Sequence, residues 1–156
     1  MLFRSGHYGR EDTTGVTLHE VSHCTLAELT SFTGQKNALS STIMTGFGLA
    51  LPAANKTAVK DGVTFVTVGP GKWLVIGEGQ EAPDLVARLE RTVGSLAAVV
   101  DQSDARALID ISGVHARATL AKGVMIDLDA VAFNSGDAAV SFAVQFWITL
   151  WQTSDV

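Results

Sequence analysis

Apolar and polar residues alternate along some stretches of the chain and recur at helical spacing along others, which separates strands from helices. Alternation predicts strands at residues 16–22, 25–32, 63–68, 73–76, 96–100, 106–111 and 142–151. Apolar residues three and four positions apart predict helices at residues 33–47, 83–93 and 113–122, with Thr33 and Ser112 as caps. Strand, strand, helix, repeated three times, predicts an α+β fold: an antiparallel sheet with three helices packed on it.

The last stretch, residues 142–151, alternates without a break. As a single strand it would place Phe142 on the core face and both Trp147 and Trp151 on the opposite face, among polar residues. A face that mixes tryptophans with polar side chains is typical of a subunit interface, so Trp147 and Trp151 are the candidate interface residues. Packing of both tryptophans beneath another layer of the same domain explains the pattern equally well.

Composition and charge limit the classes of protein to which the chain can belong. The chain has 156 residues, 47% of them hydrophobic and 17% charged, so we expect one domain, residues 16–156, after a flexible arm at residues 1–15. The net charge is -5 and no basic run is present, which argues against nucleic-acid binding. No apolar run is long enough for a membrane span or forms a signal core, so we expect a cytoplasmic protein without membrane contact.

Residues 19–23 read His-Glu-Val-Ser-His and match the H-E-x-x-H zinc motif. In metalloproteases this motif lies on a helix, where the two His bind zinc and the Glu acts as base. The Thr-rich flanks favour a strand here, on which His19 and His23 would lie about 13 Å apart, too far for one zinc ion. No His or carboxylate between Glu28 and Asp61 supplies a third ligand. We therefore expect no metal site and interpret the match as chance.

Three other features suggest chemistry that their context does not support. Residues 69–73, Gly-Pro-Gly-Lys-Trp, resemble a phosphate loop, but no Ser or Thr follows the Lys, so we expect a hairpin turn. Cys24, the one cysteine, excludes an internal disulfide, and its neighbour His23 would point to the other face of a strand. His115 lies in the first turn of an amphipathic helix and is expected at the surface.

The polar corner at residues 101–106 carries the best cluster of charged side chains, Asp101, Asp104 and Arg106. Paired carboxylates can bind a cation or share a proton. Two structural interpretations compete: an ion pair between Asp104 and Arg106, and turn capping by Asp and Ser. These three residues remain the candidate ligand-binding residues of the chain.

An ordered series of short segments resembles the gamma subunit of heterotetrameric sarcosine oxidase and extends from about residue 15 to the end. Its centre is VVDQSDAR at residues 99–106, followed by ISG at 111–113, LAKG at 120–123 and DL through AF between 127 and 133. Further members are GVTL at 15–18, GLALP at 48–52, GPGKWL at 69–74 and TLWQ at 149–152.

The resemblance implies a fold similar to the folate-binding domain of the glycine-cleavage T-protein and a place beside alpha, beta and delta subunits. Such a complex oxidises sarcosine to glycine, reduces oxygen to peroxide and transfers the one-carbon unit to tetrahydrofolate. Its FAD, FMN, NAD and tetrahydrofolate are held by the other subunits, which implies no cofactor in this chain. T-protein relatives carry a functional aspartate on a strand near residues 142–151, where this chain has Gln145, Phe146 and Trp147. We therefore assign no catalytic residue.

Two functions follow from the resemblance and the residues. The first is an accessory subunit, not catalytic alone, that binds its partners through apolar surface. The second is a stand-alone folate-binding or aminomethyl-transferring protein, with Asp101, Asp104 and Arg106 at a folate-like pocket. The family usually continues for another strand and helix beyond Val156, so the strand at residues 142–151 would have an unpaired edge, which tends to recruit a partner subunit or a second copy.

Overall fold

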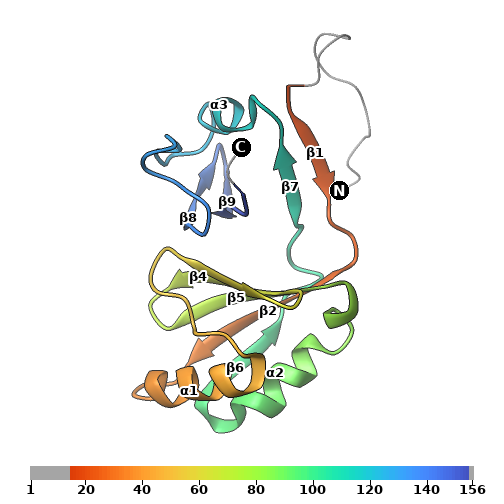
Figure 1. Cartoon of the computed structure of the whole chain (residues 1–156), viewed down its shortest axis with the longest axis vertical. Helices are drawn as coiled ribbons and strands as arrows, with labels where there is room; N and C mark the ends of the chain where they lie inside the picture. The colour runs from red at the N-terminus through yellow and green to blue at the C-terminus, as the bar shows by residue number, and fades with distance from the viewer. Residues whose placement is uncertain (1–14, 155–156) are drawn as a thin grey trace.

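A five-stranded antiparallel sheet forms the centre of the computed structural model, which describes residues 15–154 (Figure 1). The strand order is β3-β4-β5-β2-β6. The strands are β2 (Cys24–Ser31), β3 (Thr57–Lys60), β4 (Val63–Gly69), β5 (Lys72–Glu78) and β6 (Ala97–Asp101). The predicted arm, residues 1–15, lies outside the described residues except for Gly15.

Two helices cover one face of this sheet (Figure 1). Helix α1 (Lys36–Phe47) connects β2 to the β3–β4–β5 meander, and α2 (Leu85–Val93) connects β5 to β6. With β3 as an added edge strand, this is the β-α-β-β-α-β arrangement of ferredoxin-like folds. The helices bury most of their predicted apolar residues against the sheet, in a core that includes Leu39, Ile43, Phe47, Leu85, Leu89, Val93, Leu29, Phe65, Trp73 and Val75. Ala38 and Met44, which the helical spacing also placed on the buried face of α1, are exposed. Single-turn 3-10 helices at Gly79–Glu81 and Gly94–Leu96 lie on either side of α2.

The opposite face of the sheet meets a hairpin of two strands, and a second pair of strands extends away from the sheet beside this hairpin (Figure 1). Strands β1 (Thr17–Glu20) and β7 (Ile109–Ser112) form a two-stranded ribbon, and β8 (Ala138–Ala143) and β9 (Phe146–Trp151) form a hairpin. The hairpin contributes Ala138 and Trp151 to an apolar cluster on this face of the sheet, with Leu26, Val66, Leu74 and Ile76. The α+β class and the antiparallel sheets predicted from the sequence are therefore confirmed.

The third helix differs from its prediction. It spans only Ala116–Leu120 (α3), and its N-cap position is His115, because Gly113 adopts a φ of 110° and Ser112 still pairs with Thr17 in the ribbon. Ser112 is therefore not a cap, and neither is Thr33, since the N-cap position of α1 is Gln35. Leu120 packs in a separate cluster with Val124, Leu128, Phe133 and hairpin residues. Helix α3 thus covers the hairpin, whereas the prediction packed three helices on one sheet.

The predicted strand at residues 142–151 is wrong as a single element. The chain reverses at Val144 and Gln145, where Ala143 pairs with Phe146, so residues 142 and 143 end β8 and residues 146–151 form β9. The pattern did not reveal the turn, because this two-residue loop contains no Gly, Asn or Asp. Strand β3 and the first part of β8 were also missed.

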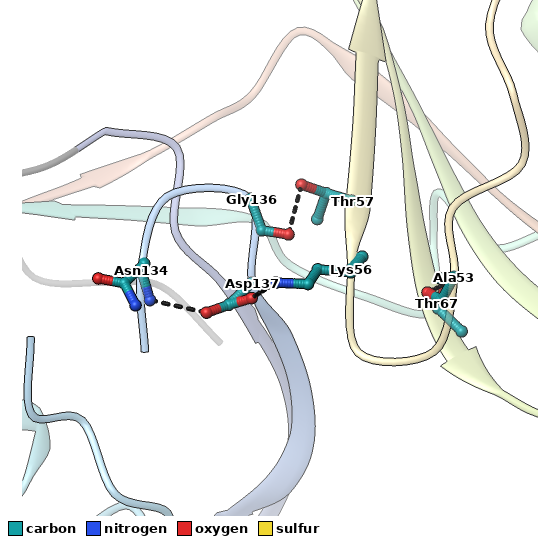
Figure 2. A network of polar contacts seen from close by, with 7 residues as sticks. All are labelled: Ala53, Lys56, Thr57, Thr67, Asn134, Gly136 and Asp137. Carbon is teal, nitrogen blue, oxygen red and sulfur yellow. Dashed lines mark hydrogen bonds and ion pairs between the residues drawn. The ribbon is translucent and has the colours of Figure 1, made fainter. Parts of the chain in front are cut away.

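A polar contact joins the hairpin to the central sheet (Figure 2). The ammonium group of Lys56 contacts Oδ1 of Asp137, and the backbone N–H of Asn134 donates to Oδ2 of the same carboxylate at 2.8 Å. The backbone N–H of Thr57 donates to Gly136 O at 2.9 Å. The loop before β3 is therefore attached to the start of β8 through both backbone and side chains. Within residues 15–154, no helix is long and apolar enough to cross a bilayer.

Candidate functional site

Asp101 closes the polar corner as a turn cap. It is the last residue of β6, and its Oδ1 accepts hydrogen bonds from the backbone N–H of Ser103 at 2.9 Å and from Ser103 Oγ at 2.7 Å. These two bonds hold the pKa of the Asp101 carboxyl below its usual range. The carboxylate is therefore ionised at neutral pH, and one of its oxygens already serves the turn.

Arg106 forms an ion pair with a strand of the sheet and not with Asp104. Its Nη2 lies 3.6 Å from Oε2 of Glu28 on β2, and Lys72 Nζ lies 4.0 Å from the other oxygen of Glu28. The same part of β2 anchors the corner, because Leu26 N–H donates to Ser103 Oγ at 3.1 Å and Gln102 N–H donates to Leu26 O at 2.7 Å. Of the two structural interpretations of this corner, turn capping describes Asp101, and the ion pair of Arg106 is made with Glu28 in place of Asp104.

A pocket of about 210 Å³ lies beside the corner, at the base of the β1–β7 ribbon. Its walls include Arg106, Ser103, Glu20 and Cys24, whereas Asp101 and Asp104 are not among the residues that line it. Sites for drug-sized ligands usually measure about 300–1,000 Å³. The pocket is therefore smaller than most such sites, and the three candidate residues do not converge on it.

The thiol and the histidines near this pocket are not arranged for catalysis. Cys24 donates its S–H to Val21 O at 3.4 Å, and burial, followed by the charge of Glu78, raises the pKa of the thiol. The thiol is therefore protonated at neutral pH and is a weak nucleophile. His19 lies in the extended strand β1 opposite Asp110, so the H-E-x-x-H match lacks the helix that zinc binding needs. Among the described residues, no three His, Cys, Asp or Glu side chains cluster as a metal site would require.

The two remaining motifs are structural, as expected. Gly69 pairs with Lys72 in the β4–β5 hairpin, and Gly71 between them adopts a φ of 69°, so the Gly-Pro-Gly-Lys segment is a turn between strands. His115 is exposed, and its backbone N–H donates to Gly15 O at 2.9 Å.

The two tryptophans of β9 lie in different environments. Both are on the face of the hairpin opposite Ile148 and Leu150, as the alternation predicts. Trp151 packs in the apolar cluster on the central sheet, whereas Trp147 is 70% exposed. Trp147 rests on Phe142, its cross-strand partner, with ring centroids 3.8 Å apart. Trp151 is therefore part of the packing within the domain. Of the two tryptophans, only Trp147 is exposed enough to serve as an interface residue.

Arg117 has a role that the sequence pattern did not reveal. From helix α3, its Nη1 donates to Leu128 O at 2.7 Å and to Phe133 O at 2.9 Å, and its Nη2 donates to Gln152 Oε1 at 2.7 Å. The guanidinium thus ties the loop before β8 to the residue that follows β9. A half-buried arginine in a short amphipathic helix has no sequence signature that distinguishes it from a surface arginine.

The sequence matches known proteins over most of its length. The sarcosine oxidase, gamma subunit family matches residues 33–155. The sarcosine oxidase subunit gamma of Arthrobacter sp is 27% identical over 142 residues, which are 90% of this chain and 68% of that protein.

Two solved structures are similar. One is the heterotetrameric sarcosine oxidase from Corynebacterium sp. U-96 in complex with pyrrole 2-carboxylate, with a TM-score of 0.78, 26% identity and coverage of 90% of this chain and 71% of that chain. The other, the glycine cleavage system aminomethyltransferase T from Bartonella henselae, shares the fold at 16% identity, with a TM-score of 0.59 and coverage of 80% of this chain and 35% of that chain. The family match spans most of the chain, and the chain belongs to the sarcosine oxidase gamma subunit family.

Proposed function

We propose that this chain is an accessory subunit of a cytoplasmic sarcosine oxidase complex, without catalytic activity of its own. Alpha, beta and delta subunits would hold the FAD, FMN, NAD and tetrahydrofolate of that complex. The family match and the similarity to a heterotetrameric sarcosine oxidase support this proposal. The structural contribution of the chain would then be a folded module that binds its partner subunits.

The proposal rests on one observation: the charged residues of the polar corner, residues 101–106, make contacts that stabilise the fold. Asp101 caps a turn through Ser103, and Arg106 is paired with Glu28. The neighbouring pocket, at about 210 Å³, is smaller than most ligand sites, and the pKa of its Cys24 thiol is raised by burial. These structural roles of Asp101 and Arg106 support an accessory subunit more than a folate-binding one.

Co-expression with the other subunits tests the proposal. We expect this chain to co-purify with flavin-containing polypeptides in a fixed stoichiometry and to show no sarcosine oxidation when purified alone. Recovery of the chain by itself, with no flavoprotein attached at any salt concentration, would contradict the accessory role.

A stand-alone folate-binding protein is the second candidate, favoured by the location of Arg106 and Ser103 on a pocket wall. Titration calorimetry of the isolated chain with tetrahydrofolate separates the two functions. The accessory role predicts no binding at micromolar concentration. Micromolar binding that Asp101→Ala or Arg106→Ala weakens, with Asp104→Ala as a comparison, would favour the second candidate.

A further inference from the structure

The pocket of about 210 Å³ at the base of the β1–β7 ribbon is framed by hydrogen bonds of the backbone. Val21 N–H donates to Leu108 O at 2.9 Å, and Gln102 N–H donates to Leu26 O at 2.7 Å. Ser103 completes the frame, because its Oγ accepts a hydrogen bond from Leu26 N–H at 3.1 Å. The walls of the pocket are therefore held in place by the fold itself.

Two side chains of opposite charge, Glu20 and Arg106, line this pocket and are not paired with each other. Glu20 is the last residue of β1, and its carboxylate makes no hydrogen bond or ion pair with residues 15–154. Arg106 makes one ion pair, in which its Nη2 lies 3.6 Å from Oε2 of Glu28, and its guanidinium donates no hydrogen bond within the same residues. Both groups therefore keep their bonding capacity for a ligand.

The charges beside the pocket amount to one positive and one negative charge. Glu28 is shared between Arg106 and Lys72, whose Nζ lies 4.0 Å from its other oxygen, so two cations face one carboxylate. One positive charge is left uncompensated there, and Glu20 supplies one negative charge. A simple anion in the pocket would be repelled by Glu20 and a simple cation by Arg106, whereas a ligand that carries both charges is attracted by each.

We propose that this pocket binds a small amino acid as its zwitterion, with the ligand carboxylate on Arg106 and the ligand ammonium group on Glu20. The size agrees, because 210 Å³ corresponds to about seven water molecules at about 30 Å³ each, which is room for a ligand of about five to eight non-hydrogen atoms. Leu26 and Leu108 add apolar wall for the carbon atoms of the ligand. The inference goes beyond the proposed function, because it concerns this chain alone and needs no other subunit.

Titration of the full chain with glycine, followed through its backbone amide NMR signals, tests the inference. Glycine is the smallest amino acid, and acetate and methylammonium each carry one of its two charges. At constant ionic strength, we expect glycine to shift the signals of residues 20–22 and 103–108 until they saturate, with a dissociation constant in the millimolar range. Acetate and methylammonium are expected to bind at least about 10-fold more weakly, because each leaves one charged group of the pocket unpaired.

Glu20→Gln and Arg106→Gln separate the two contacts, and each is expected to weaken glycine binding at least about 10-fold. Asp104→Asn is the matched control, because Asp104 is an exposed acid of the same corner that does not line the pocket, and it is expected to bind glycine like the wild type. Thermal unfolding shows whether each variant folds. Glu20→Gln removes no side-chain contact within residues 15–154, so it remains a valid test even if loss of the Arg106–Glu28 pair destabilises the chain.

Three results would overturn the inference. Absence of any saturable shift up to about 50 mM glycine would show that the pocket binds no amino acid. Equal affinity for glycine and for acetate or methylammonium would show a site for a simple ion. Unchanged glycine binding in either variant would show that the ligand is not held between the two charges. None of these results bears on the accessory role, which co-expression tests separately.

Discussion

Phe142 and Trp147 stack across the β8–β9 hairpin, with ring centroids 3.8 Å apart and planes inclined at 36°. Uninterrupted alternation along residues 142–151 would have placed these rings on opposite faces of one strand. They share a face because the chain reverses between them. Phe142 therefore supports the exposed indole of Trp147, and the position of Trp147 depends on a neighbour within the same hairpin.

A double-mutant cycle measures this support. We expect Phe142→Ala and Trp147→Ala to show a coupling of about 0.5–1.5 kcal/mol in the free energy of unfolding, because stacked aromatic pairs contribute about that much beyond area burial. Chemical denaturation of the four chains gives the value. As a control, Phe32→Ala combined with Trp147→Ala is expected to be additive within about 0.5 kcal/mol, and equal coupling in both cycles would contradict a specific stack.

The turn at Val144 provides a second prediction. Val144→Gly is expected to stabilise the isolated chain by about 1 kcal/mol, because Gly adopts a φ of 56° without the steric cost that valine bears. Gln145→Gly, at the second position of the same loop, is the control. Gln145 is not among the residues with positive φ, so this change is expected to be neutral or destabilising. A lower melting temperature for Val144→Gly would contradict the strain.

The sequence predicts much of the fold, because apolar periodicity is set by burial against one neighbouring layer. Helices α1 and α2 and strands β2, β4, β5 and β6 have strong patterns and were predicted close to their observed bounds. The short strand β3 was not predicted, because its four residues include exposed Val59 and Lys60 and do not alternate between an apolar and a polar face. The β8–β9 hairpin was not predicted, because Val144 and Gln145 are unusual turn residues.

The candidate site was harder to predict than the fold. Sequence spacing brought Asp101, Asp104 and Arg106 together as one cluster, but the partner of Arg106 is Glu28, 78 positions away along the chain and on another strand. Burial of one tryptophan and exposure of the other depend on where the central sheet ends beneath the hairpin. Tertiary contacts of this kind leave no local pattern.

The Asp137 carboxylate predicts a specific dependence of stability on pH. The hydrogen bond from Lys56, and then the backbone N–H of Asn134, hold its pKa in the folded chain below the ordinary value of about 3.9. A lowered folded pKa contributes stability that is fully present above about pH 4 and is lost as the pH falls through the folded pKa. We expect Asp137→Asn to remove this part of the acid dependence and to lower the melting temperature at pH 7.

Asp104→Asn is the matched control for this measurement, since Asp104 is exposed and takes no part in the hydrogen bonds of the polar corner. Thermal unfolding between pH 3 and pH 7 compares the two variants with the wild type. The interpretation fails if Asp137→Asn and the wild type lose stability in parallel as the pH falls below about 4.

Arg117 gives the last prediction, which concerns the β8–β9 hairpin and the loop before it. Arg117→Met keeps the apolar stem but removes the donors to Leu128 O, Phe133 O and Gln152 Oε1. Because hydrogen bonds to a charged group contribute about 1.5–3 kcal/mol, we expect a loss of at least about 2 kcal/mol in the free energy of unfolding. The control is Arg91→Met, at an exposed arginine near the end of α2, which is expected to cost about 0.5 kcal/mol.

Hydrogen exchange locates the effect of Arg117→Met. Residues 124–136 and the β8–β9 hairpin should exchange faster in this variant, while the five-stranded sheet keeps its protection. Uniform loss of protection across the sheet would instead show that the two layers unfold as one unit.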